Sequence, residues 1–271
     1  MTTSSTLRAT PSASPPVLRR GTTWLLDHAL GPTSLVLVAL TVWLGLWVTP
    51  PDRVQGNLVR LLYLHPAVAW VALYLAFGLA ALCSALYLWP RTRSEKWDLL
   101  AASAVDVGIL FLSLTLATGM LWGRPEWGVW WTWDARLTST ALLELLFIGY
   151  VAMRRVPAEP HVRARRCAVL ALLSSLDVPI VHFSVQWWNG LHQGATVFNA
   201  GFNFKIHGSM LYTLLLSFVA MTCVFAWMVR KRYAIAVRAA VRESRELEDA
   251  IVERRAEGRL DHPGLDYSEA P

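Results

Sequence analysis

Six long apolar runs constrain this sequence more than any other feature. A helix needs about 20 mostly apolar residues to cross a bilayer, with about 17 as a lower limit. Lipid cannot satisfy the open edge of a strand, so each run is expected to be helical. The sequence therefore predicts an all-α, polytopic membrane protein with six transmembrane helices. The runs cover approximately 33–48, 68–89, 99–121, 137–153, 167–183 and 208–229.

The distribution of basic residues predicts the orientation of these helices. If the helices alternate in direction, 20 of the 25 Lys and Arg residues fall on one side of the membrane, in 1–22, 90–96, 154–166 and 230–271. Cytoplasmic loops are the ones enriched in Lys and Arg. Both the N- and C-termini are therefore predicted to be cytoplasmic. The same rule accounts for the net charge of +6 without a nucleic-acid partner.

The chain divides into three predicted regions. Residues 1–22 are rich in Ser, Thr and Pro and lack a signal-peptide core, so we expect a disordered cytoplasmic leader. Residues 23–229 form the six-helix domain. Residues 230–271 form a charged cytoplasmic tail, in which mixed Arg and Glu predict a solvated helix to about Arg255. The three cysteines form no Cys-x-x-Cys motif, which argues against a thiol redox carrier and a c-type cytochrome.

The second outer loop concentrates aromatic residues in the sequence WGRPEWGVWWTWDAR, from Trp122 to Arg136. Glycines and a proline at 123, 125 and 128 argue against a regular helix at its start. From Trp127 onward, helical spacing would place three indoles and Asp134 on one face. An interfacial belt usually has one or two such rings per span end. Five rings instead indicate a shelf for a flat ligand, formed by Trp122, Trp127, Trp130, Trp131 and Trp133.

Histidines also gather at the outer ends of the predicted spans. Imidazole is the usual axial ligand of haem iron, and two imidazoles give a six-coordinate site. His65 precedes Pro66 at the start of the second span, and His192 lies between two glycines in the third outer loop. We expect these two to converge over the tryptophan shelf. A structural role is expected for His182 at a helix end, and an interfacial one for His207.

Charged residues around the shelf and within the spans complete the candidate set. Arg124 and Arg136 flank the shelf and could bind haem propionates, because Arg matches a carboxylate bidentately. The alternatives are a surface charge and pairing between Arg136 and Asp134, and Asp134 is expected to cap or brace the loop. Carboxylates inside spans suit either interhelical contacts or proton transfer. They are Asp106, Glu144 and Asp177.

Two stretches resemble a known family. Residues 122–138, WGRPEWGVWWTWDARLT, resemble the tryptophan-rich WWD signature of haem-handling proteins. Residues 179–194, PIVHFSVQWWNGLHQG, are similar to the CcmC family of system I cytochrome c maturation. The similarity runs over about 43–229, and six spans match the smaller branch of the superfamily. Departures are His65 directly before Pro66, the charged Asp177 and a longer tail.

The resemblance implies a non-enzymatic protein of the bacterial inner membrane that binds haem b non-covalently on its periplasmic face. It implies that His65 and His192 are the axial ligands. The implied partners are a membrane-tethered periplasmic haem chaperone, the membrane and ATPase subunits of an ABC transporter, and a small single-span membrane protein. Delivery of haem to the chaperone would be the function.

Two other classes remain as alternatives. A b-type electron-transfer or quinol-linked subunit would carry histidine pairs inside its spans, where this sequence has none at mid-span. A structural assembly scaffold would use the aromatic loop to grip another protein, and it would purify without haem.

Overall fold

The computed structural model describes residues 20–188, 190–192 and 206–261. Internal contacts divide the chain into two units. One unit comprises Asp27–Ala236, which holds the helical bundle and the candidate site. The other comprises Met1–Leu26 together with Val237–Pro271. The descriptions of packing below concern the first unit alone.

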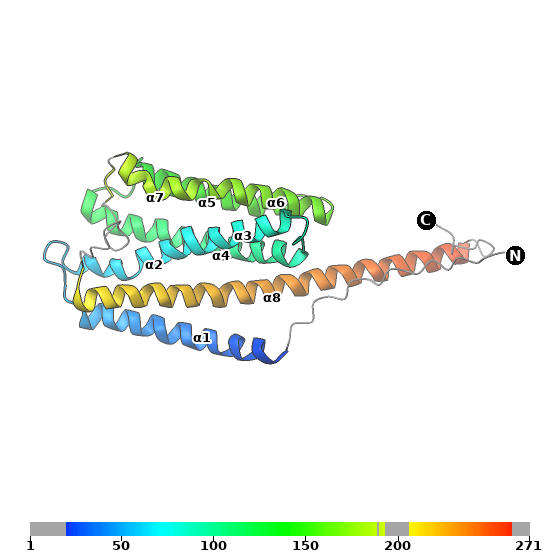
Figure 1. The fold of residues 1–271 in the computed structure, drawn as a ribbon, viewed down its shortest axis with the longest axis horizontal. Coiled ribbons are helices and arrows are strands. Elements are labelled where there is room, and N and C mark those ends of the chain that lie inside the picture. Colours follow the sequence, from blue (N-terminus) through cyan, green and yellow to red (C-terminus); the bar gives the residue numbers. More distant parts are fainter. Residues whose placement is uncertain (1–19, 189, 193–205, 262–271) are drawn as a thin grey trace. The chain divides into compact units, whose positions relative to one another are not determined.

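Helices account for nearly all of the described structure (Figure 1). Short π-helical turns follow α1 and separate α2 from α3, and a 3₁₀ helix precedes α2. In chain order the α-helices are α1 (Arg20–Trp43), α2 (His65–Trp70), α3 (Phe77–Leu88), α4 (Glu95–Trp127), α5 (Ala135–Arg155), α6 (Pro160–Ser175), α7 (Asp177–Trp187) and α8 (Gly208–Asp261).

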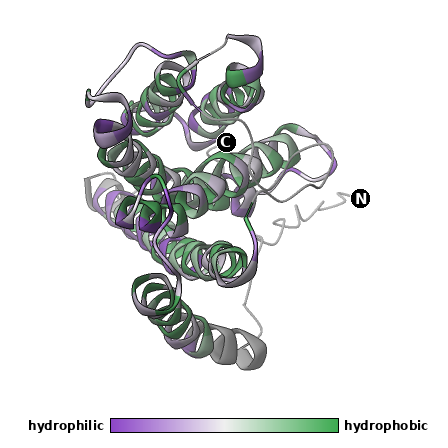
Figure 2. Ribbon diagram, turned by 90° about the vertical axis from the view of Figure 1, so that its left-hand side faces the viewer, coloured by the Kyte–Doolittle hydropathy of each residue, from purple (hydrophilic) through white to green (hydrophobic). Residues whose placement is uncertain are grey.

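Six of the described helical segments are long and apolar enough to span a membrane. Each coincides with one predicted apolar run, and the short fourth and fifth runs gain length from flanking residues. Hydrophobic residues line these helices, whereas hydrophilic ones concentrate in the connections (Figure 2). The prediction of an all-α protein with six transmembrane helices is confirmed. The spans are His28–Val48, Asn57–Leu88, Glu95–Trp127, Ala135–Arg155, Pro160–Trp187 and Gly208–Glu257.

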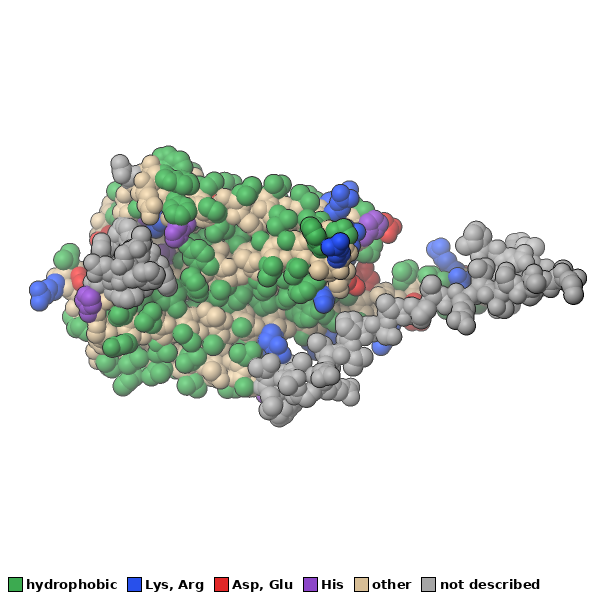
Figure 3. Space-filling view, viewed as in Figure 1, with side chains coloured by type: hydrophobic (Ala, Val, Ile, Leu, Met, Phe, Trp, Pro, Cys, Tyr) green, Lys and Arg blue, Asp and Glu red, His purple; other side chains and the backbone are tan. Residues whose placement is uncertain are grey.

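Aromatic side chains join the helices at the centre of the bundle. Phe77 of α3 stacks on Phe147 of α5, with ring centroids 3.6 Å apart and an interplanar angle of 14°. Phe111 of α4 meets Phe225 of α8 edge to face, at 6.2 Å. Lipid tails are as apolar as these side chains, so the hydrophobic effect does not drive membrane helices together. Van der Waals packing between side chains such as these does so instead. On the visible face, hydrophobic side chains cover the middle of the bundle (Figure 3).

The start of the tryptophan loop differs from the prediction. α4 continues through Gly123 and Pro125 and ends at Trp127, so the expectation of irregular structure before Trp127 is wrong. Pro125 lies in the last turn of α4, so its missing N–H removes a hydrogen bond only two residues before the helix ends. Gly128, with φ of 77°, then ends the helix in the left-handed conformation that glycine adopts most easily.

The predicted helical face beyond Trp127 is also wrong. The segment between Gly128 and Asp134 is not helical, and α5 begins at Ala135. Trp122 and Trp127 therefore belong to α4, whereas the other three tryptophans lie in an irregular connection. The five rings do not share one helix face.

The fifth span is interrupted between α6 and α7 at Leu176. Pro179 in the first turn of α7 has no N–H for the preceding turn, which accounts for the break. His182 lies inside α7, five residues before its end, so the expectation of a position at a helix end is wrong.

The carboxylates within the spans mostly contact other helices. Asp106 of α4 accepts a hydrogen bond from Arg232 Nε of α8 at 2.6 Å, and Ser113 of α4 donates to Glu144 of α5. Asp98, which the sequence analysis did not single out, binds Arg154 bidentately at 2.7 and 2.6 Å. Interhelical contact is therefore the reading that fits Asp106 and Glu144.

The two ends of the chain are described in part. α8 remains helical to Asp261, in agreement with the helical tail predicted from the Arg and Glu pattern. Within the predicted disordered leader, 20–22 already belong to α1. The rest of that leader, and the tail from 262 onward, lie outside the described residues.

Candidate functional site

His65 is the first residue of α2, and α4 fixes its imidazole. Its Nδ1 lies 3.0 Å from the hydroxyl oxygen of Thr118. That hydroxyl already donates its only proton to the carbonyl of Leu114, at 2.6 Å, so it can only accept from the imidazole. Neutral His65 must then carry its proton on Nδ1, which leaves the lone pair on Nε2. No feature of the sequence indicated Thr118 as a hydrogen-bond partner of His65.

His192 is fixed in the same way by Asp134. Its Nδ1 lies 3.0 Å from Oδ1 of Asp134, whose side chain is only 4% exposed. Burial and the nearby positive charge of Arg136 hold the pKa of His192 below its usual value, despite the opposing effect of Asp134. A neutral imidazole that donates from Nδ1 to a carboxylate again presents a lone pair on Nε2.

Asp134 joins the residues that follow α7 to the start of α5. Besides His192, its carboxylate accepts the backbone N–H of Arg136 at 2.9 Å and that of Leu191 at 3.0 Å. Burial would raise the pKa of Asp134, but these hydrogen bonds and the neighbouring imidazole together lower it, so the group stays ionised. The predicted capping role is confirmed, because Asp134 is the N-cap of α5.

Gly190 allows the loop to approach this carboxylate. A Cβ atom at position 190 would lie 2.0 Å from Oδ2 of Asp134, closer than any real contact. Only glycine therefore fits here without moving the loop that carries Leu191 and His192.

Each histidine has its own tryptophan from the end of α4. The ring of Trp122 meets His65 edge to face, with centroids 5.9 Å apart, and Trp127 meets His192 at 4.8 Å. Because both imidazoles contact the same end of α4, they lie at one end of the bundle. The positive charge of Arg136 acts on both imidazoles.

Of the three remaining tryptophans, Trp130 and Trp133 are exposed and Trp131 is half-buried. Trp130 is 55% exposed and Trp133 is 84% exposed. Trp131 packs edge-on against Trp133, with 5.8 Å between ring centroids. The loop thus has two indoles directed at the histidines and an exposed aromatic surface beside them.

Arg136, in the first turn of α5, contacts α7. Its Nη2 donates to the backbone carbonyl of His182 at 3.0 Å, and the His182 imidazole is hydrogen-bonded to the hydroxyl of Tyr74. The Nε of Arg136 is buried and has no hydrogen-bond partner among the described residues. A buried donor without a partner is costly, so this atom is well suited to bind an acceptor from a ligand.

Arg124 has a different position from Arg136. Its Nη1 donates to the carbonyl of Gly128 at 2.7 Å, where it closes the C-terminal end of α4. Its guanidinium carbon lies 6.0 Å from the centre of the Trp130 ring. Arg124 is therefore tied to the exposed part of the loop. His207, by contrast, makes no described contact with either His65 or His192.

The side chains of this site suit a metal ion that is already held by four ligand atoms of a bound organic group. No cluster of three or more His, Cys, Asp or Glu suited to a metal ion occurs in the part of the chain that the structure describes. Two neutral imidazoles can supply two axial ligands, whereas a planar macrocycle supplies the other four. The adjacent indoles and the unpartnered guanidinium N–H fit a flat ring that carries carboxylates.

Fold and site together define a multi-pass α-helical membrane protein with a histidine- and tryptophan-lined site at one end of its bundle. Over residues 9–248 the chain matches the model of the family CcmC, Heme exporter protein C, and it belongs to that family.

Individual relatives agree with this assignment. A "Heme exporter protein C" of Bradyrhizobium diazoefficiens is 36% identical over 197 residues, which cover 72% of this chain and 73% of the relative. The protein of the same name from Escherichia coli K12 is 35% identical, over 68% of this chain and 74% of the relative. A putative cytochrome c biosynthesis ccmC-like mitochondrial protein of Marchantia polymorpha is 35% identical, over 68% and 76%.

Proposed function

We propose that this protein binds haem b non-covalently and delivers it for cytochrome c maturation. The observation that carries the proposal is that His65 and His192 are hydrogen-bonded in the same way. Each imidazole uses Nδ1 for a protein partner, Thr118 or Asp134, and so keeps the lone pair of Nε2 for the haem iron. Metal-binding histidines commonly use the second nitrogen in this way.

The surrounding residues have separate proposed roles. Trp122 and Trp127 pack against the haem beside the two ligands. Arg136 binds a propionate through its buried Nε. The exposed rings of Trp130 and Trp133 lie where a partner protein can reach them, and Arg124 supports this exposed surface. Trp131 braces Trp133 from the side.

The charge distribution and the family support the location and the partners that we propose. With the Lys- and Arg-rich loops in the cytoplasm, the site opens on the periplasmic face of the bacterial inner membrane. Haem held there is within reach of a membrane-tethered haem chaperone. The membrane and ATPase subunits of an ABC transporter and a small single-span membrane protein complete the proposed complex. Haem is a transported ligand, and no enzymatic step is proposed for this chain.

Transfer of haem to the chaperone tests this function. In a membrane reconstitution, His65→Ala and His192→Ala are expected to reduce haem on the chaperone to the level found without the protein, because each loses an iron ligand. Trp130→Ala combined with Trp133→Ala is expected to retain bound haem yet lower its transfer. The readouts are haem on this protein and haem on the chaperone, measured separately by absorbance.

His207→Ala is the matched control, because His207 is an exposed histidine close to the start of α8. It should leave both readouts unchanged. Normal chaperone loading by either ligand variant, or by the double tryptophan variant, would count against the proposal.

A further inference from the structure

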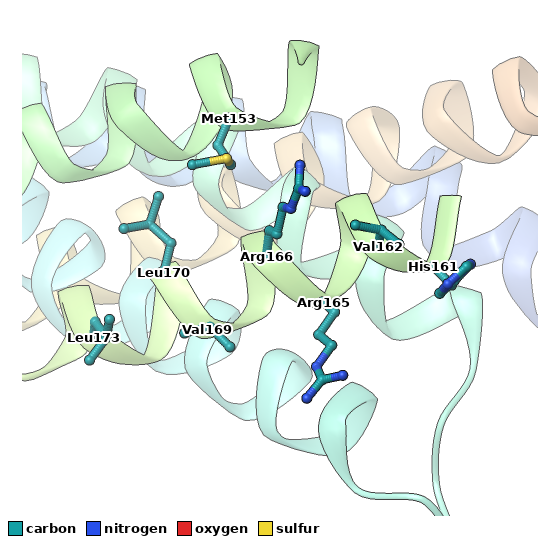
Figure 4. Close-up of a pocket in the computed structure, with 8 residues that line it drawn as sticks. All are labelled: Met153, His161, Val162, Arg165, Arg166, Val169, Leu170 and Leu173. Carbon is teal, nitrogen blue, oxygen red and sulfur yellow. The ribbon is translucent and has the colours of Figure 1, made fainter. Parts of the chain in front are cut away.

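An open groove lies where the C-terminal end of α5 meets the first three turns of α6 (Figure 4). Its volume is about 500 Å³, and Met153 of α5 forms one side of it. The α6 residues occur in two rows at four-residue spacing, which places each row along one side of the helix. The first row is His161, Arg165, Val169 and Leu173, and the second is Val162, Arg166 and Leu170.

The charged and the apolar side chains occupy different parts of this groove. Its cationic residues lie within the first two turns of α6, whereas the residues from Val169 to Leu173 lie further along the helix. At 1.5 Å per residue, the groove extends over about 18 Å of helix from His161 to Leu173. A ligand that fits must therefore combine an anionic head with an apolar tail.

The cations of the groove are available to such a ligand. Arg165 and Arg166 are exposed, and neither forms an ion pair with any carboxylate in the described part of the chain. The nearby Arg154, by contrast, is bound bidentately by Asp98. The apolar end is open as well, since Leu173 is 59% exposed and Val169 is 44% exposed.

We propose that this groove binds an anionic phospholipid of the bilayer. Arg165 and Arg166 bind the phosphate, and an acyl chain lies along Met153, Val169 and Leu173. Basic pockets at helix ends are typical sites for anionic head groups. A purely apolar partner helix would cover the apolar end but would leave the two guanidinium groups without anions, whereas a phospholipid accounts for both parts of the groove.

Lipid retention by the purified full-length protein tests this assignment. Native mass spectrometry after equilibration with phosphatidylglycerol or phosphatidylcholine should detect a preference of about 10- to 30-fold for phosphatidylglycerol, the range expected for two cations near an anionic head group. Arg165→Gln with Arg166→Gln should abolish the preference. Arg165→Lys with Arg166→Lys should keep most of it, which separates charge from folding.

Two controls make the outcome specific. Arg91→Gln with Lys96→Gln removes one exposed cation from the connection between α3 and α4 and one from the first turn of α4, and it should leave the preference intact. Inorganic phosphate alone should not displace the lipid, because it has no acyl chain. The assignment is overturned if both Gln pairs behave alike, if phosphate displaces the lipid, or if a photo-cross-linking residue at position 173 captures a protein instead of lipid in native membranes.

Discussion

Replacing Asp134 with Asn is expected to weaken haem binding by about 10- to 100-fold, the effect typical of removing a hydrogen-bond partner of a metal ligand. The carboxylate accepts hydrogen bonds from Arg136, Leu191 and His192, and these bonds connect the segment after α7 to the start of α5. An amide turns an N–H₂ group toward at least one of these donors. Asn is as good an N-cap as Asp, so α5 itself should remain intact.

A haem titration followed by absorbance measures this effect, and the thermal midpoint reports on folding. Asp52→Asn is the matched control, because Asp52 also accepts two backbone N–H groups, from Val54 and Gln55, but in the connection between α1 and α2. Equal haem affinities for Asp134→Asn and the unaltered protein would show that His192 does not depend on the carboxylate.

Replacing Arg154 with Ala is expected to cost roughly 3 kcal/mol of stability, the lower end of the range for breaking a buried ion pair. The side chain of Asp98 is 9% exposed and that of Arg154 is 20% exposed, so the pair is mostly withdrawn from solvent. Without Arg154, Asp98 would remain as a buried carboxylate with no counter-charge. Changing both partners, Asp98→Asn with Arg154→Gln, should recover part of the loss.

Unfolding in mixed detergent micelles measures this difference in stability. Arg155→Ala serves as the control, because Arg155 is the neighbouring residue but is exposed. If the Arg154 and Arg155 variants unfold at the same denaturant concentration, the ion pair contributes nothing measurable to stability.

The helices could be predicted from sequence because desolvation of the backbone dictates helical structure in lipid. The residues at which the helices end were harder to predict. Gly123 and Pro125 have low helix propensity, but near the end of the long α4 their cost is small. Gly128, which follows Trp127 and has φ of 77°, ends that helix instead. The apolar run therefore placed the end of α4 six residues too early, at 121 instead of at Trp127.

The candidate ligands were visible in the sequence, whereas their partners were not. His65 and His192 stood out by residue type and by position beside the tryptophans. Thr118 is an ordinary residue within an apolar run, and its contact with His65 depends on how α2 packs against α4. The hydrogen bond between Tyr74 and His182 likewise depends on tertiary packing, which a sequence pattern does not contain.

Electron paramagnetic resonance of the ferric haem-loaded protein tests most directly whether both imidazoles bind one iron. Two axial imidazoles make the iron six-coordinate and low-spin, and we expect this species in the unaltered protein. His65→Ala and His192→Ala should each convert it to a high-spin species, and added imidazole should restore the low-spin signal. A high-spin signal in the unaltered protein, or a signal that either substitution leaves unchanged, would contradict the account.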